Sequence, residues 1–274
     1  MTEKGKIVLT IVGLAEDNGD VEFKSFLEQL ELVRRAIHET KRIIFNDDEN
    51  KKIAYFKVTD LSHQSPAKIV LEAVPYSVET TNQTEELVNE FFNSLSEIEQ
   101  GRLPKRFDFE AIDAFREMSR PVNNKKIDLF TISRNGDVHT NINEFPIKID
   151  AILGPDVLEY GSAKGRLEYL NLHERANIFY IYSTHELPKI KCRFPSKLRA
   201  DVIKAIDKYV TVYGTKKFKP NIKSYNPYEI LVDNVVIHPD VNELPKLIDL
   251  FGTAPDATGD KSSEEFVRGI RDEW

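Results

Sequence analysis

The feature that most constrains the fold is a series of five short segments, rich in β-branched and aromatic residues, within residues 161–238. The segments alternate apolar and polar residues, a pattern typical of strands that bury one face. They are 165–172, 178–182, 190–194, 209–214 and 229–237. Between the third and fourth segments, aliphatic residues recur with helical spacing over 198–206. The sequence therefore predicts five strands with one helix after the third.

This order of elements resembles an OB-fold, the five-stranded barrel of many nucleic-acid-binding proteins. A glycine lies near each of the first and fourth segments, Gly165 and Gly214. The resemblance covers under a third of the chain. OB-folds also bind proteins and sugars, so the fold alone does not fix the ligand.

The resemblance implies that single-stranded nucleic acid binds to the second and third strands and the flanking loops. In the third strand, basic residues alternate with Ile190, Cys192 and Phe194, which we expect to face the core. The implied nucleic-acid contacts are Tyr180, Tyr182, Lys189, Lys191, Arg193, Lys216, Lys217, Phe218, Lys219 and Lys223. The alternative is a solvated strand face, on which lysine also prevents edge-to-edge aggregation.

The charge distribution agrees with a nucleic-acid-facing middle part. The net charge of the chain is -7. Residues 155–240 hold 14 lysines and arginines against 10 acidic residues, whereas residues 1–110 hold 14 against 21 and residues 241–274 hold 4 against 8. A basic block thus lies between acidic flanks, which is one way that a chain separates a nucleic-acid contact from its other parts.

Before this block, the patterns predict an α+β domain. Strands are expected at 6–13, 53–60 and 67–75, and amphipathic helices at 22–45, 87–98 and 111–118. Gly101 is placed to end the second helix in the left-handed conformation, Asn135-Gly136 predicts a hairpin turn, and a weaker helix covers 142–153. The Gly154-Pro155 pair predicts a boundary. The expected domains are 1–154 (α+β), 155–240 (OB-fold-like barrel) and 241–274 (linker and C-terminal helix).

The C-terminal segment predicts a short interaction helix. Ser262 and Glu265 form a capping box, the signature of a helix start. Phe266, Ile270 and Trp274 follow at intervals of four and make one apolar stripe, with the only tryptophan of the chain as its last member. A helix this short is marginal alone in water, so it needs a surface to pack on.

This segment resembles the C-terminal segments of antitoxins that inhibit PIN-domain ribonucleases. The resemblance implies that Phe266, Ile270 and Trp274 anchor the helix in a groove of the nuclease. It also implies that Arg268 or Arg271 pairs with the partner's metal-binding carboxylates, since an Arg–carboxylate pair is strong and specific. The alternative is that the tail docks on its own chain or on a second copy.

Catalytic and metal-binding patterns are absent from the sequence. It holds no Walker loop, no dinucleotide glycine motif, no H-E-x-x-H and no G-x-S-x-G. His63 beside Ser62 does not make a catalytic pair, the acidic run at 47–49 is typical of a turn, and Cys192 is expected in the core. A single cysteine excludes a disulfide framework. We expect no cofactor, and no apolar run is long enough to cross a membrane.

These patterns together predict a cytoplasmic, non-catalytic regulatory protein of antitoxin type. It would bind a partner such as a PIN-type nuclease through its tail and single-stranded nucleic acid through its barrel. A second hypothesis is a scaffold protein whose barrel binds protein and whose tail packs on its own chain. A third is an enzyme of a type that these motifs do not reveal.

Overall fold

The computed structural model describes residues 5–45, 52–62, 65–135, 139–173, 176–182, 189–222, 227–239 and 258–272. The chain divides into two compact units. The first unit holds residues 1–160 and 215–230, and the second holds residues 161–214 and 231–274. The segment 215–230, which the sequence patterns assign to the barrel domain, thus groups with the N-terminal part of the chain.

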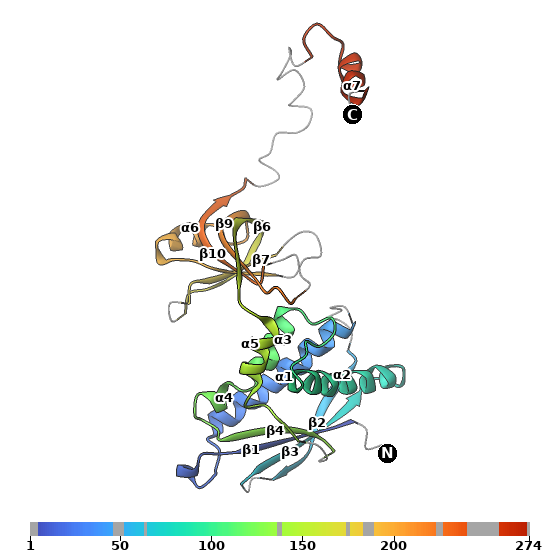
Figure 1. The fold of residues 1–274 in the computed structure, drawn as a ribbon, viewed down its shortest axis with the longest axis vertical. Coiled ribbons are helices and arrows are strands. Elements are labelled where there is room, and N and C mark those ends of the chain that lie inside the picture. Colours follow the sequence, from blue (N-terminus) through green and yellow to red (C-terminus); the bar gives the residue numbers. More distant parts are fainter. Residues whose placement is uncertain are drawn as a thin grey trace. The chain divides into compact units, whose positions relative to one another are not determined.

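The first unit is built on an antiparallel sheet of five strands in the order β2-β3-β1-β4-β5 (Figure 1). The strands are β1 (Lys6–Val12), β2 (Ala54–Ser62), β3 (Ala67–Pro75), β4 (Leu129–Arg134) and β5 (His139–Asn141). The strand β3 lies between β1 and β2, which are joined by a helix. This is the split β-α-β arrangement, and it places the connecting helices on one face of the sheet.

All helices of this unit except the short α4 are those that the apolar spacing predicts. They are α1 (Phe23–Phe45), α2 (Thr81–Glu99), α3 (Phe109–Glu117), the short α4 (Arg120–Asn123) and α5 (Phe145–Leu153). Gly101 has a φ of 73°, so the left-handed helix end predicted for it is confirmed. Two backbone bonds complete this end, since the amides of Gly101 and Arg102 donate to the carbonyls of Ile98 and Glu97.

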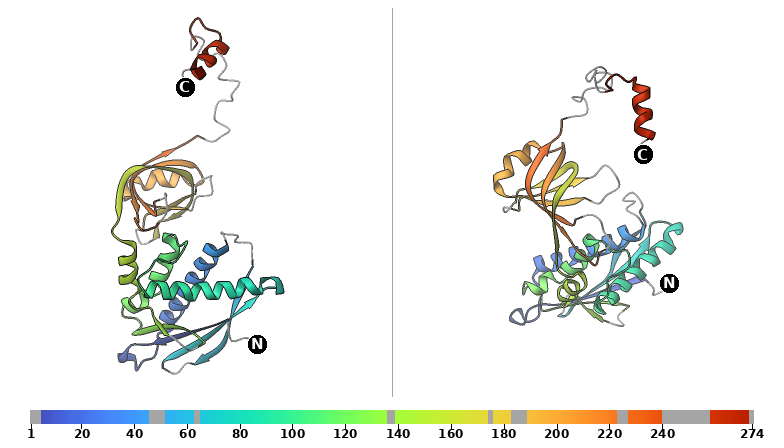
Figure 2. Two further views of the ribbon diagram at one scale, coloured as in Figure 1. Left: turned by 45° about the vertical axis from the view of Figure 1, so that its right-hand side comes forward. Right: turned by 45° about the horizontal axis from the view of Figure 1, so that its top comes forward.

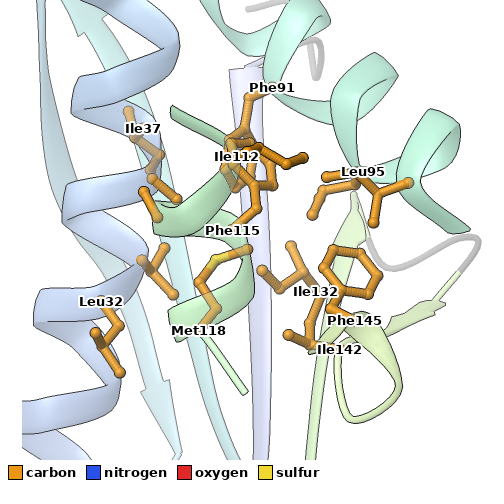
Figure 3. Close-up of a cluster of buried hydrophobic side chains, with 14 of the residues drawn as sticks. Leu32, Ile37, Phe91, Leu95, Ile112, Phe115, Met118, Ile132, Ile142 and Phe145 are labelled. Carbon is orange, nitrogen blue, oxygen red and sulfur yellow. The ribbon is translucent and has the colours of Figure 1, made fainter. Parts of the chain in front are cut away.

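The helices and the sheet enclose one large apolar core, and the helices lie on the same face of the sheet in both views of Figure 2. Phe91 of α2, Phe115 of α3 and Phe145 of α5 meet Ile132 of β4 in this core (Figure 3). All four side chains are fully buried. A close-packed interior of this kind serves stability and leaves no room for a ligand, so ligand contacts are expected on the surface of this unit.

The segment 215–230 contributes to the same core. Ile222 is buried within the cluster of α1, α2 and α3 residues. Beside it, the Asn221 side-chain amide donates a hydrogen bond of 2.6 Å to the carbonyl oxygen of Ile152 at the end of α5. The first unit is therefore completed by a segment that lies far along the sequence from its other elements.

A second sheet, most of which belongs to the second unit, has five strands in the order β10-β8-β7-β6-β9 and closes on itself. The strands are β6 (Val157–Asn171), β7 (Ile178–Tyr182), β8 (Ile190–Arg193), β9 (Tyr209–Phe218) and β10 (Glu229–Ile237). The helix α6 (Arg199–Lys204) lies between β8 and β9 in the sequence. The α+β class, with five strands and a helix after the third, is confirmed.

Two glycines allow strands of this sheet to approach closely. A Cβ atom at Gly214 would lie 2.0 Å from the carbonyl oxygen of Leu231, and one at Gly165 would lie 2.6 Å from that of Tyr182. No real side chain tolerates such distances to a backbone atom. Glycine is therefore required at both positions by the curvature of the sheet.

The last described element is the helix α7 (Ser263–Asp272). Its capping box is present, because the Ser262 hydroxyl accepts from the Glu265 amide and the Glu265 carboxylate accepts from the Ser262 amide. Phe266, Val267 and Ile270 are exposed. The predicted start of the helix at Ser262 is confirmed, and its apolar side has no cover from the described residues.

Candidate nucleic-acid and partner-binding surfaces

The strands β7 and β8 present alternate residues to the inside and the outside of the closed sheet. Ile190, Cys192 and Phe194 are buried, so the expected core positions are confirmed, and Phe179 and Ile181 of β7 are fully buried as well. The residues between them face outward, where Tyr180 of β7 is in register with Lys191 of β8. The structure therefore brings a tyrosine and a lysine of the predicted nucleic-acid contacts side by side.

A β-bulge in β6 adds Tyr169 to this outward surface, although regular alternation with Leu167 would place it in the core. Leu167 of β6 is in register with the buried Ile181, whereas Tyr169, two residues later, is in register with the outward Tyr180. The extra residue between them turns Tyr169 outward, where it is 48% exposed. The sequence signal for this bulge is the three-residue spacing between Leu167 and Leu170. Both leucines lie opposite buried residues of β7, Ile181 and Phe179, but a regular strand returns to the same face only after an even number of residues.

The two tyrosines form an aromatic pair with a lysine above it. The ring centroids of Tyr169 and Tyr180 are 5.3 Å apart with their planes at 62°, and the Lys189 Nζ lies 5.6 Å from the Tyr180 ring centre. We call this surface the outer face; its members are Tyr169, Tyr180, Tyr182, Lys189, Lys191 and Arg193. Such rings can stack on bases while the cations neutralise phosphates, which is how sequence-tolerant single-strand sites work.

The lysines that follow this surface in the sequence have partners within the first unit. Lys217 forms an ion pair with Glu229 at 2.8 Å, and Lys219 forms one with Asp156 at 2.7 Å. The Lys219 ammonium also donates to the carbonyl oxygen of Gly154 at 3.0 Å. Both lysine side chains are mostly shielded from solvent. The Lys217 pair lies within the segment 215–230, whereas Lys219 ties this segment to residues 154–156 of the same unit. Lys216 and Phe218 are half-buried.

The group around Asp156 is tightly coupled. Burial raises the pKa of Tyr228, and a hydrogen bond between its hydroxyl and Asp156 raises that pKa further. Burial alone would raise the pKa of Asp156, but the hydrogen bonds from Lys219 and Tyr228 bring that pKa below its usual value. Asp156 is therefore a carboxylate that keeps its charge and fastens the segment, which is a structural role.

The helix α7 displays its predicted partner-binding residues on an exposed helix. Phe266 is 37% exposed and Ile270 is 48% exposed, and Val267, which the stripe at intervals of four omits, is also exposed at 51%. Arg268 forms an ion pair of 3.5 Å with Glu264, one turn earlier, in which both side chains are well exposed. Arg271 is exposed in the last turn. The three apolar side chains are therefore exposed together on one capped helix.

Several predicted residues lie outside the described part of the chain. They are Lys223, Trp274, His63 and the acidic run at 47–49. Cys192 is buried, as expected for a packing residue. Among the described residues, no group of three or more His, Cys, Asp or Glu side chains is placed to hold a metal ion.

Comparison with protein-family models, with curated proteins and with solved structures found no match for this chain. Within the part that the structure describes, no helix has the length and apolar character needed to cross a membrane. The two surfaces of the chain that bear on its function are the outer face and the apolar side of α7.

Proposed function

We propose that this is a non-catalytic regulatory protein of antitoxin type, which binds a partner protein through α7. The observation that carries the proposal is the exposure of Phe266, Val267 and Ile270 on a helix with a complete capping box. Ten residues of helix are marginal in water, so the helix gains most of its stability from a surface that covers these side chains. Its partner, by the resemblance to antitoxins, is a PIN-type nuclease.

The charges of the helix fit such a partner. Arg268 and Arg271 extend from the turns that carry the apolar side chains, and a nuclease of this class presents carboxylates at its metal site. An Arg–carboxylate fork in a desolvated groove is stronger than a surface pair. The ion pair of Arg268 with Glu264 is exposed and therefore weak, so that Arg268 can exchange partners at little cost.

The test is a titration of the full chain against the product of the neighbouring gene. The double substitution Phe266→Ala/Ile270→Ala is expected to weaken binding by about 1,000-fold, since each of the two anchor side chains contributes about 2 kcal/mol at an interface. Lys261→Gln, an exposed residue just before the helix, is the matched control and is expected to change affinity less than about threefold. Equal affinities for wild type and double variant would contradict the proposal.

The fluorescence of Trp274, the only tryptophan in the sequence, distinguishes this proposal from the scaffold alternative. A tail that awaits a partner leaves Trp274 open to a soluble quencher until the nuclease is added. A tail that packs on its own chain shields Trp274 in the isolated protein, and Phe266→Ala/Ile270→Ala then exposes it.

A second proposed function is the binding of single-stranded nucleic acid by the outer face. Numbered along the chain, the strands of the closed sheet follow the order 1-2-3-5-4 and return to 1, with α6 after the third. This order supports assignment as an OB-fold, whose second and third strands form the usual binding face. The pair Tyr169–Tyr180 with Lys189 above it supplies the stacking and the charge.

This function is tested by the anisotropy of labelled oligo(dT) and oligo(U) over a salt series. Tyr180→Ala/Lys191→Gln is expected to weaken binding at least tenfold and to reduce the salt slope by about 0.7, the value of one phosphate contact on a single strand. Lys204→Gln, an exposed lysine on α6, is the control. Binding by wild type without salt dependence would contradict the proposal.

A further inference from the structure

A second exposed group of tyrosines and lysines lies in the first unit, where β2 begins and β3 ends. The ring centroids of Tyr55 and Tyr76 are 5.1 Å apart with their planes at 55°. The Lys57 Nζ lies 5.5 Å from the Tyr55 ring centre, and the Lys52 Nζ lies 5.9 Å from that of Tyr76. We call these four residues the tyrosine-lysine cluster.

The backbone fixes the cluster. Tyr55 is in register with Val74 of β3, and the Tyr76 amide donates to the carbonyl oxygen of Ile53 at 3.1 Å. The two tyrosines therefore extend from adjacent, hydrogen-bonded stretches of backbone. Their rings remain accessible, since Tyr55 is 37% exposed and Tyr76 is 52% exposed.

The cluster repeats the chemistry of the outer face in a different unit. In both places two tyrosines contact each other at about 5 Å and an ammonium group lies within 6 Å of a ring centre. A tilted aromatic pair on adjacent strands also stabilises a sheet. That role accounts for the two rings, but it does not account for a lysine over each of them.

The local charge is positive in an otherwise acidic region. Glu72 of β3 is in register with Lys57 on one side and with Lys6 of β1 on the other. This acid therefore lies between two lysines, and Lys52 adds a third positive charge nearby. An anion that stacks on a ring, such as a nucleotide, matches a surface of this composition.

We propose that the tyrosine-lysine cluster is a second contact site for single-stranded nucleic acid, separate from the outer face. The inference rests on the proposed nucleic-acid function. Tyr76, the more exposed ring, stacks on a base, and Lys52 and Lys57 neutralise the phosphates that flank it. With two such sites, the binding of a long strand that reaches both has a steeper salt dependence than the binding of a short strand that fills only one.

The test compares oligonucleotides of about 6 and about 30 nucleotides, as oligo(dT) and as oligo(U), on the full chain. Lys52→Gln/Lys57→Gln is expected to reduce the salt slope for the long strands by about 1.4, which is 0.7 for each lost phosphate contact. Tyr76→Ala is expected to weaken binding of the long strands about tenfold. Lys105→Gln/Lys125→Gln, two exposed lysines of the same unit, is the matched control. The DNA and RNA arms decide which strand the cluster takes.

The outcomes separate this inference from the function on which it rests. An unchanged slope in Lys52→Gln/Lys57→Gln, together with weakened binding in Tyr180→Ala/Lys191→Gln, overturns the second site and leaves the outer face in place. The reverse pattern supports the second site and removes the outer face. Wild-type protein that binds neither oligonucleotide overturns both. Far-ultraviolet circular dichroism of each variant verifies that the fold is retained.

Discussion

The rings of Phe109 and Tyr228 stack with their centroids 4.0 Å apart and their planes within 22° of parallel. Phe109 begins α3, and Tyr228 belongs to the segment 215–230 of the same unit, more than a hundred residues later. The Tyr228 hydroxyl meets Asp156 at the same time. One aromatic side chain therefore joins three separate stretches of sequence in the first unit.

This stack predicts a measurable coupling energy. Phe109→Ala, Tyr228→Ala and the double variant, compared by urea unfolding, are expected to give an interaction energy of about 0.5–1.5 kcal/mol beyond the loss of buried area. Tyr228→Phe keeps the ring and loses only the hydroxyl, so it is expected to retain this coupling. Strictly additive losses in the double variant would exclude an energetic role for the stack.

The ion pair of Asp156 with Lys219 predicts a dependence of stability on acid. The pKa of Asp156 in the folded protein lies below its unfolded value of 3.8, so its contribution is fully present above that value. It is lost as the pH falls through the folded pKa. The difference in free energy of unfolding between wild type and Asp156→Asn is therefore expected to be largest near neutral pH and to shrink below about pH 4.

The matched control for this titration is Asp207→Asn, which removes an exposed ion pair with Arg166. Its effect is expected to stay below about 1 kcal/mol at every pH. A pH-independent difference for Asp156→Asn would mean that the carboxylate contributes through packing alone.

The close approach at Gly214 predicts a strong response to a single methyl group. Gly214→Ala puts a Cβ 2.0 Å from the Leu231 carbonyl oxygen, so the two strands must separate. We expect a loss of about 1–3 kcal/mol or more from the second unit, read from its thermal unfolding. An unchanged melting temperature would show that the sheet relaxes there without cost.

The same substitution at Gly269 is expected to have the opposite effect. Gly269 lies inside α7, and a Cβ there meets no atom within 4 Å. Alanine favours a helix interior over glycine by about 1 kcal/mol, so Gly269→Ala raises the helical content of the tail. If α7 binds its partner as a helix, the variant also binds more tightly, because less conformational freedom is lost on association. Weaker binding would indicate that the partner backbone approaches Gly269 closely.

The elements of this chain could be predicted because their patterns are local. The spacing of Phe91 and Leu95 in α2, or of Phe179 and Ile181 in β7, reports burial within a few residues. The capping box of Ser262 and Glu265 works over three residues, and the structure contains it. The interactions behind such patterns join residues only a few positions apart, so they can be recognised in a single sequence.

The features that were missed depend on partners far along the chain. Tyr169 faces outward because of a bulge in the pairing of β6 with β7, whose one trace in the sequence is the three-residue spacing of Leu167 and Leu170. Lys219 was expected at a phosphate and has Asp156 as its partner. The pair Tyr55–Tyr76 forms because β2 pairs with β3, which brings Tyr55 beside the residue that follows β3. A single sequence holds no periodic signal for the last two of these pairings.

The division of the chain into interleaved units has a consequence for biosynthesis. A ribosome that has just made residue 160 has not yet supplied Ile222 or Tyr228, so the first unit cannot complete its core at that stage. The closed sheet is made in the interval and itself waits for β10, which starts at residue 229. Neither unit can finish folding while the chain is still short of this point, and the two must mature together after most of the polypeptide has emerged.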